Sequence, residues 1–210
     1  MLEKRLFSFD NIEFRSGDSA GQRPRIVATA STYNLLSQPL PLDDKGNTFV
    51  ERVLPGAFDE SCKTNDLKSY WNHDSRLILG RFSNQTLTIR LTPTGLEFEA
   101  LPPVGASYVA DLQILMTEKY VYQCSFGFHV WPGGDRWLTE NGMRVRELIK
   151  ADLREVSVVS DPAYTNGATT AAVRSFTAWQ TAEHRRRQRQ ALAVFSFRSH
   201  PQTGHAPRSK

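Results

Sequence analysis

Hydrophobic and polar residues alternate along several short segments of the chain. The clearest segments are Arg25–Tyr33, Thr86–Leu91 and Leu96–Leu101. Alternation with a period of two is typical of a strand that buries one face. Thr92-Pro-Thr-Gly95 separates the last two segments with residues that favour a tight turn, so a hairpin is predicted there. The first half of the chain is therefore predicted to be mainly β.

Two helices are predicted to interrupt the strands. A short one follows Pro55-Gly56, and a longer one covers about Ala106–Lys119. In the longer one, Val109, Leu112 and either Leu115 or Met116 recur at helical spacing. Two more strands are predicted downstream, over about 120–131 and 142–160.

The chain is predicted to divide into a packed domain of residues 1–165 and a tail of residues 166–210. Beyond Asp161-Pro162 the composition turns to Ala, Thr, Asn and Gly, which marks the end of the packed part. A strongly cationic helix is predicted from Ser175 to about Val194, and the remaining tail has the composition of a disordered segment.

Charge separates these two parts further. The net charge is +4, with 40% hydrophobic and 23% charged residues, which is ordinary for a soluble globular protein. From Arg174 onward there are eight Lys or Arg residues against Glu183 alone, so Met1–Val173 carries 18 basic and 21 acidic residues, about −3. The basic character belongs to the tail, and nucleic-acid binding by the main domain is not expected.

Several classes of function are not expected from this sequence. No apolar run approaches the roughly 20 residues that span a bilayer, and charged residues are mixed into Met1–Phe14, so we expect neither membrane insertion nor export. Cys62 and Cys124 are too few for a disulfide framework and lack zinc-site spacing, which favours a reducing cytoplasm. Without a Walker-type loop or a His-Glu-x-x-His motif, no cofactor and no metal are expected.

A histidine marks the first segment with candidate chemistry. His73 lies in Asn72-His-Asp74, at the end of an aromatic strand and before a predicted turn. Such a histidine can project into a cleft while its backbone is held, which suits a general base. By itself the segment is more typical of an ordinary polar turn than of a catalytic histidine.

A serine on a predicted strand marks the second segment. In Tyr120–His129, alternation puts Ser125 on one face and Cys124 and Phe126 on the other. Ser125 is a candidate nucleophile, although it also fits a structural strand serine. Gly127 would let a substrate backbone approach, and Cys124 is predicted to lie in the core as a small apolar residue.

A carboxylate within a β-branched run marks the third segment, Ala151–Ala163. Glu155 lies among apolar strand residues, and burying it is costly unless it is paired or hydrogen-bonded. A histidine that it orients would be such a partner. A solvent-facing Glu on an edge strand is the alternative.

Taken in order, these segments resemble the prohead proteases of tailed bacteriophages, serine peptidases similar in fold to the herpesvirus assemblins. The resemblance covers roughly Arg25–Ala163 and rests on four short motifs: Val53-Leu-Pro-Gly-Ala-Phe58, Asn72-His-Asp74 followed by Leu79-Gly-Arg81, Ser125-Phe-Gly-Phe128, and Glu155-Val-Ser-Val-Val-Ser-Asp-Pro-Ala163. It implies a mainly β fold with flanking α-helices, an antiparallel, closed or strongly bent β-barrel of the assemblin type. Residues 1–165 would then be the protease domain.

The resemblance also implies roles for the candidate residues. His73 would be the general base, Ser125 the nucleophile and Glu155 the third member that orients His73. In the herpesvirus relatives the third member is a second histidine, and Glu147 is a competing carboxylate in this chain. No residue can be matched to the oxyanion hole; Arg154, Arg146 and backbone amides near Arg81 all stay open.

The function implied is a serine endopeptidase that cleaves scaffold and capsid proteins, and itself, inside the immature prohead in the host cytoplasm. Its partners would be the major capsid protein with its scaffold segment and, by analogy with the herpesvirus relatives, a second copy in a homodimer. The basic tail would dock the protease onto the shell or scaffold. Two alternatives are a catalytically silent capsid or scaffold component with the protease fold, and a nucleic-acid-binding protein that acts through the tail, which would bind in a salt-sensitive way.

Overall fold

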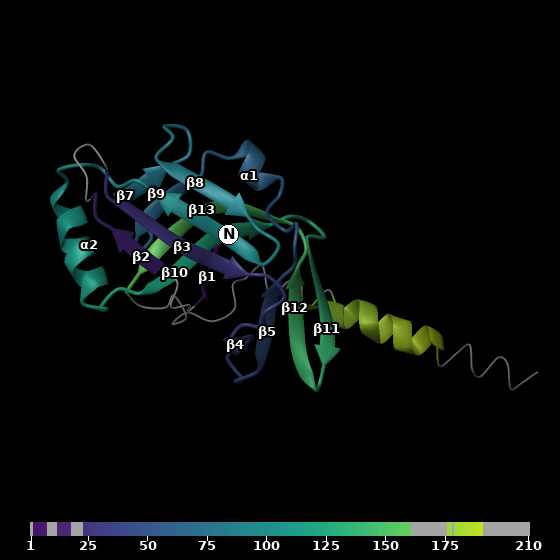
Figure 1. Ribbon diagram of the computed structural model, residues 1–210. Helices are drawn as coiled ribbons and strands as arrows, with labels where there is room; N and C mark the ends of the chain where they lie inside the picture. Colours follow the sequence, from purple (N-terminus) through teal and green to yellow (C-terminus); the bar gives the residue numbers. More distant parts are fainter. Residues whose placement is uncertain (1, 8–11, 18–22, 161–175, 178, 191–210) are drawn as a thin grey trace, which may run out of the picture.

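In the computed structural model, β-strands make up most of the chain, which confirms the mainly β prediction (Figure 1). The structure describes residues 2–7, 12–17, 23–160, 176–177 and 179–190. The two predicted helices are confirmed as α1 (Ser61–Thr64) and α2 (Ser107–Thr117). Residues 176–177 and 179–190 are also helical. None of the described helices is long and apolar enough to cross a membrane.

A five-stranded sheet carries the candidate residues. Its order is β1-β10-β13-β6-β7, and all neighbours are antiparallel except β13 and β6, which are parallel. The strands are β1 (Glu3–Phe7), β10 (Gln123–Val130), β13 (Ala151–Val159), β6 (Lys68–Trp71) and β7 (Asp74–Arg81).

A second sheet covers one face of the first. This covering sheet has the order β2-β3-β9-β8 and consists of β2 (Ile12–Arg15), β3 (Arg25–Thr32), β9 (Gly95–Ala100) and β8 (Leu87–Leu91). The antiparallel β8–β9 pairing confirms the predicted hairpin. The main core includes Ile26 and Phe98 from the covering sheet and Phe126 and Val156 from the five-stranded sheet, all at most 1% exposed.

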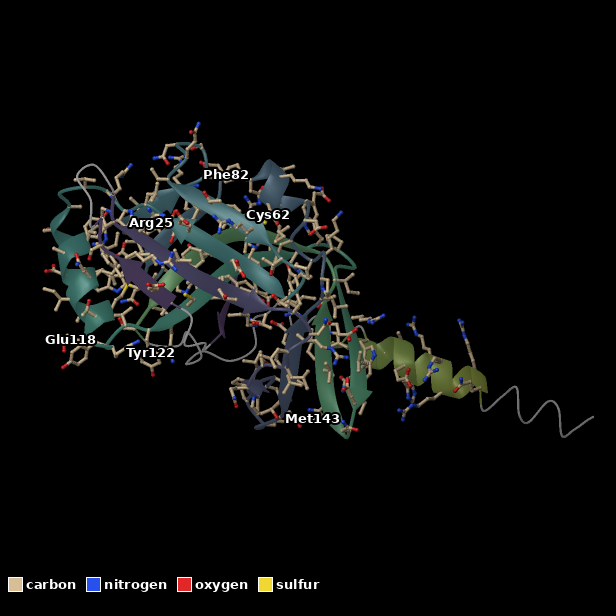
Figure 2. All side chains as sticks on the ribbon, in the orientation of Figure 1. Arg25, Cys62, Phe82, Glu118, Tyr122 and Met143 are labelled. Atoms are coloured by element: carbon tan, nitrogen blue, oxygen red, sulfur yellow. The ribbon has the colours of Figure 1, made fainter. Side chains whose placement is uncertain are left out.

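A third sheet projects from the side of this sandwich (Figure 1). The projecting sheet has the order β11-β12-β5-β4 and consists of β11 (Asp135–Glu140), β12 (Met143–Leu148), β5 (Thr48–Val53) and β4 (Leu40–Pro41). Met143 lies at its far end (Figure 2).

The projecting sheet has a small hydrophobic cluster of its own, to which the C-terminal helix contributes. Phe49 and Trp137 pack together there, Phe176 packs against Trp137, and Trp179 packs at the edge of the cluster. The cationic helix therefore begins with a buried anchor. Residues 161–175 lie outside the described residues, so the boundary between 1–165 and 166–210 stays a prediction.

The prediction of one long strand over 142–160 is wrong. Residues 143–148 and 151–159 are separate strands in different sheets, β12 and β13. The chain turns between them at Ile149 and Lys150, whose N–H groups both donate to the carbonyl oxygen of Gly134. Apolar residues are frequent on both sides of this turn, so the hydrophobic pattern hides it. The described strand pairings give three sheets and do not close any of them, so the closed barrel stays a prediction.

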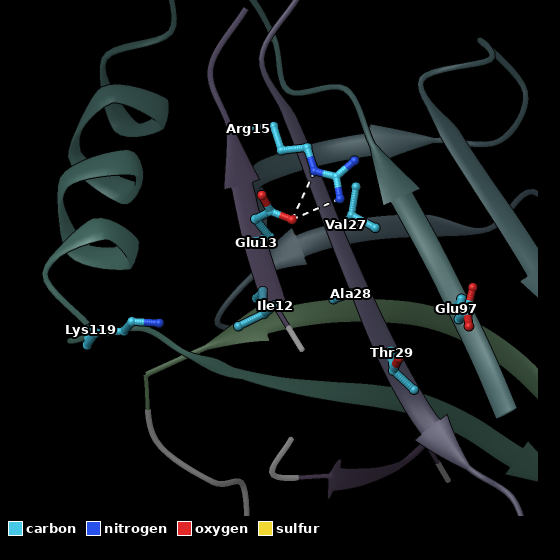
Figure 3. Close-up of a pocket in the computed structure, with 8 residues that line it drawn as sticks. All are labelled: Ile12, Glu13, Arg15, Val27, Ala28, Thr29, Glu97 and Lys119. Carbon is cyan, nitrogen blue, oxygen red and sulfur yellow. Dashed lines mark hydrogen bonds and ion pairs between the residues drawn. The ribbon is translucent and has the colours of Figure 1, made fainter. Parts of the chain in front are cut away.

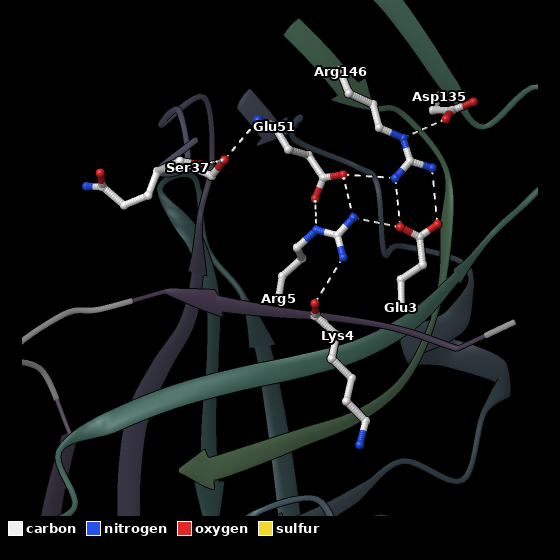
Figure 4. A network of polar contacts seen from close by, with 8 residues as sticks. Glu3, Lys4, Arg5, Ser37, Glu51, Asp135 and Arg146 are labelled. Carbon is white, nitrogen blue, oxygen red and sulfur yellow. Dashed lines mark hydrogen bonds and ion pairs between the residues drawn. The ribbon is translucent and has the colours of Figure 1, made fainter. Parts of the chain in front are cut away.

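A buried ionic network joins β1 to the projecting sheet (Figure 4). Arg146 on β12 binds Glu3 on β1 at 2.7 Å and Asp135 on β11 at 2.7 Å, and Arg5 on β1 binds Glu51 on β5 at 2.7 Å. Buried charges are tolerated only where each finds a partner, and here carboxylates and guanidiniums alternate. The network therefore holds the edge strand β1 in place beside β10.

We predict that Glu3→Gln lowers the free energy of unfolding by about 2–3 kcal/mol at neutral pH, because the buried guanidiniums of Arg5 and Arg146 lose a negatively charged partner. Burial raises the pKa of Glu3, but the hydrogen bond and charge of Arg146 and the charge of Arg5 outweigh it and leave the pKa below its ordinary 4.5. This stabilisation is thus present above pH 4.5 and is lost as the pH falls through the lowered value.

Thermal unfolding of wild type and Glu3→Gln between pH 7 and pH 3 checks this prediction. The gap in Tm should narrow in acid. Glu13→Gln is the control. Glu13 pairs with Arg15, and because the Glu13 side chain is 59% exposed and that of Arg15 is 53% exposed, this substitution should change Tm little. An equal gap for both variants would contradict the role given to the network.

Candidate active site

A two-residue turn between β6 and β7 positions His73. Trp71 and Asp74 pair across the turn, and its central residues Asn72 and His73 have φ values of 53° and 58°. Positive φ at both central positions is the pattern of a type I′ hairpin, which favours Asn and then Gly. A histidine in the second position costs on the order of 1 kcal/mol of strain, which a structural role alone does not require.

Asn72 fastens this turn to the end of β13. Its N–H donates to the carbonyl oxygen of Val158 at 2.8 Å, and its side-chain oxygen accepts from the N–H of Ser160 at 2.8 Å. The turn therefore cannot shift without breaking bonds to β13, and the His73 side chain is directed over that strand.

The pairing of β10 with β13 positions the other two side chains. Phe126 pairs with Val156 and both lie in the core, so alternation puts Ser125 and Glu155 on the opposite face of the sheet. Gly127 is the direct partner of Glu155. Ser125 and Glu155 are thus neighbours on adjacent strands, on the face that His73 covers.

The three side chains form a continuous hydrogen-bonded chain. His73 Nδ1 lies 2.5 Å from Glu155 Oε1, and His73 Nε2 lies 2.9 Å from Ser125 Oγ. The carboxylate favours a proton on Nδ1, which leaves Nε2 free to accept the Ser125 hydroxyl proton. The side chains of His73 and Glu155 are only 8% and 9% exposed, so little water competes for these bonds.

Gly127 leaves room for the Glu155 carboxylate. A Cβ placed on Gly127 would lie 2.8 Å from Glu155 Cγ and 2.9 Å from Oε1, which is closer than atoms can pack. The sequence suggested a close approach of substrate at this position. The close approach that the structure shows is that of Glu155.

The competing carboxylate lies in another place. Glu147 on β12 is bound by Arg52 at 2.6 Å and by Arg136, on the projecting sheet. Of the two glutamates that the sequence left open, Glu155 contacts His73.

The arginines considered for the oxyanion hole are occupied elsewhere. Arg146 is buried in the ionic network, and Arg154 pairs with Asp152 at 2.5 Å. The Arg81 side chain binds Asp66 at 2.6 Å, and its backbone N–H donates to Thr86 Oγ1 at 2.9 Å.

Cys124 lies in the core, as alternation predicted. It is 3% exposed, and burial raises the pKa of its thiol to about 12. A neutral thiol on the far face of β10 is no alternative to Ser125 as a nucleophile.

Three neighbours of His73, Ser125 and Glu155 were not predicted from the sequence. Asn72 clamps the turn, and its signal was an Asn at a two-residue turn between strands. Ser157 and Tyr70 lie beside Ser125 in one row across β10, β13 and β6, and burial with the charge of Glu155 raises the pKa of Tyr70. Ser157 could have been found by counting two residues on from Glu155 along the strand.

An open pocket of about 500 Å³ lies on the covering sheet, away from these residues (Figure 3). It has no His73, Ser125 or Glu155 in its lining, which consists of Ile12, Glu13, Arg15, Val27, Ala28, Thr29, Glu97 and Lys119. Among the described residues, no group of three or more His, Cys, Asp or Glu side chains is arranged to hold a metal ion.

The arrangement of Ser125, His73 and Glu155 is that of a Ser–His–acid hydrolase site. The chain belongs to the caudovirus prohead serine protease family, whose family model matches residues 10–182. That family is one of serine peptidases. Neither the curated proteins nor the solved structures contain a match.

We predict that Gly127→Ala lowers peptidase activity at least tenfold, because the new methyl group displaces Glu155 from His73. Gly142→Ala is the matched control. Gly142 has φ +78°, and a Cβ placed on it would have nothing within 4 Å, so its substitution strains the backbone without touching the site. The rate of capsid-protein cleavage on co-expression, followed by intact mass, measures the effect. Equal loss in both variants would contradict the proposed reason.

Proposed function

We propose that this protein is a serine endopeptidase in which Ser125 is the nucleophile, His73 the general base and Glu155 the residue that orients His73. The observation that supports this most directly is the hydrogen-bonded chain from Glu155 through His73 to Ser125. Two strands and one turn, far apart in the sequence, contribute one member each, and the histidine is held in a strained position of that turn. A catalytically silent protein would have no need of this arrangement.

The proposed reaction follows from the donors and acceptors of the triad. Ser125 Oγ bonds to the carbonyl carbon of the scissile peptide while its proton passes to His73 Nε2, and the carbonyl π electrons move to the oxygen. The tetrahedral intermediate then collapses, the C–N bond breaks, and His73 gives its proton to the leaving amine. A water molecule then bonds to the acyl carbon while its proton passes to His73 Nε2. The ester bond to Ser125 Oγ breaks as His73 returns the proton to that oxygen, and Glu155 stabilises the imidazolium in both halves.

We place this activity inside the assembling phage prohead in the host cytoplasm, on the ground of the family. The substrates would be the major capsid protein, through its scaffold segment, and the protease itself. No cofactor takes part in this chemistry.

Access to Ser125 favours activation by assembly. Ser125 is 0% exposed, and its partner in β1, the outer strand of the sheet, is Leu6. A substrate peptide can reach Ser125 only after the chain around it moves. We place this movement in the immature shell, where a second copy in a homodimer or the scaffold contacts the protease, so that cleavage is confined to the shell.

The helical residues 179–190 would dock the protease onto an acidic scaffold surface. Phe176 packs on the projecting sheet, and the helical residues 179–190 extend away from the main body (Figure 1). Glu183 neutralises part of this charge through Arg186 and Arg187. This supports docking to a protein partner over binding of nucleic acid.

Co-expression of this chain with its major capsid protein tests the proposal. We expect wild type to yield shortened capsid protein and self-cleaved enzyme by mass spectrometry, and Ser125→Ala to yield neither. Equal processing with both, or shell assembly without processing in either, would move the catalytically silent shell component to the front.

A pair of glutamate variants tests the third role. Glu155→Gln should lower kcat by roughly 10²–10⁴-fold, because a neutral amide no longer favours the productive tautomer or the imidazolium. Glu147→Gln removes a charge of the same type from the projecting sheet and should leave kcat within about twofold, as its contacts are to Arg52 and Arg136. The reverse ranking in the capsid-processing rate would assign the role to Glu147.

A further inference from the structure

Ser157 lies directly across from the proposed nucleophile. In the register of β10 with β13, Ser125 pairs with Ser157. The flanking pairs, Phe126 with Val156 and Cys124 with Val158, all belong to the core. Both serine side chains therefore emerge on the face that His73 covers.

The Ser157 hydroxyl is buried without a hydrogen-bond partner in the described part of the chain. The residue is 0% exposed, and its Oγ has neither a backbone nor a side-chain partner there. A buried hydroxyl without a hydrogen-bond partner destabilises the folded state, because it has lost its bonds to water and gained none in return. Val156, Val158 and Val159 are apolar and suit a strand, so the fold alone would favour another apolar residue at position 157. A group left unpaired in the resting protein is available to a partner that arrives with the substrate.

The site needs a donor that the triad does not supply. Both ring nitrogens of His73 are used, on Glu155 and on Ser125. The side chains of Arg81, Arg146 and Arg154 are each paired with carboxylates away from Ser125. The oxygen of the tetrahedral intermediate gains a full negative charge and requires hydrogen-bond donors.

The spacing of paired strand residues allows Ser157 to be one of those donors. Side chains directly opposite each other on antiparallel strands have Cβ atoms about 4.5–5.5 Å apart. The oxyanion is bonded to the carbon that Ser125 Oγ attacks, so it lies two bonds from Ser125 Oγ. The hydroxyl of a neighbouring residue can therefore reach the oxyanion with a hydrogen bond of about 2.7 Å. We infer that Ser157 is a catalytic residue, donating its hydroxyl hydrogen bond to the oxyanion.

This inference rests on the proposed function and adds a role to the same reaction. No bond to Ser157 forms or breaks. Its O–H points to the oxygen that holds the electron pair of the former carbonyl π bond, and the donation weakens when the carbonyl re-forms. Because the interaction is made in the transition state and not in the resting protein, it raises kcat rather than substrate affinity.

Ser157→Ala tests the inference through two readouts that a packing role would move together. The variant removes the hydroxyl without adding volume, so its Tm should equal or exceed that of wild type, since an unsatisfied polar group is lost. The rate of capsid-protein cleavage on co-expression should fall at least tenfold, as removal of an oxyanion donor costs on the order of 10²–10³ in kcat.

Ser69→Ala is the matched control. Ser69 is also 0% exposed with an unpartnered hydroxyl, but it pairs with Val156 and faces the core. Its removal should affect Tm in the same direction and leave the cleavage rate unchanged.

The outcomes separate this inference from the proposed function. If Ser125→Ala abolishes cleavage and Ser157→Ala cleaves at the wild-type rate, the proposed function stands and the role of Ser157 is overturned. A slower Ser157→Ala whose Tm has fallen in parallel makes Ser157 a packing residue, which also overturns it. Normal cleavage by Ser125→Ala overturns the proposed function itself.

Discussion

The antiparallel pairing of β10 with β13 is the constraint on which the candidate site depends. It sets Ser125 beside Ser157 and Gly127 beside Glu155, and it turns all four away from the core. A slip of one residue would exchange the two faces, burying the polar groups in the core and exposing Phe126 and Val156. The same apolar contacts that stabilise the sandwich therefore fix the register of the site.

Placing His73 beside Ser125 and Glu155 requires a strained backbone conformation. His73 occupies a left-handed turn position that favours glycine, and the turn is held by the bonds of Asn72 to β13. The backbone strain at His73 is thus compensated by hydrogen bonds of the neighbouring residue, Asn72. The result is an imidazole whose two nitrogens are held between a carboxylate and a hydroxyl, with little freedom to reorient.

The buried ionic network also helps to hold the candidate site in place, from the β1 edge of the five-stranded sheet. Glu3 and Arg5 tie the outer strand β1 to the projecting sheet, and β1 pairs with β10 across from Ser125. A network of this kind is a weak source of stability compared with apolar packing, but it fixes one arrangement because each buried charge needs its partner. It links the position of strand β1, which lies beside Ser125, to the sheet on which Phe176 packs.

The sequence by itself determined the local features: the mainly β character, the β8–β9 hairpin, α2, the core position of Cys124, and His73, Ser125 and Glu155 as candidates through a resemblance carried by short motifs. These follow from alternation, turn residues and side-chain chemistry, which are local properties. Only the tertiary structure decided that the 142–160 run is two strands in different sheets, that Gly127 makes room for Glu155, and that Glu155 rather than Glu147 contacts His73. Each of these depends on contacts between residues far apart in the chain, such as His73 and Glu155, which are 82 positions apart. Such contacts leave no periodic signal along the chain.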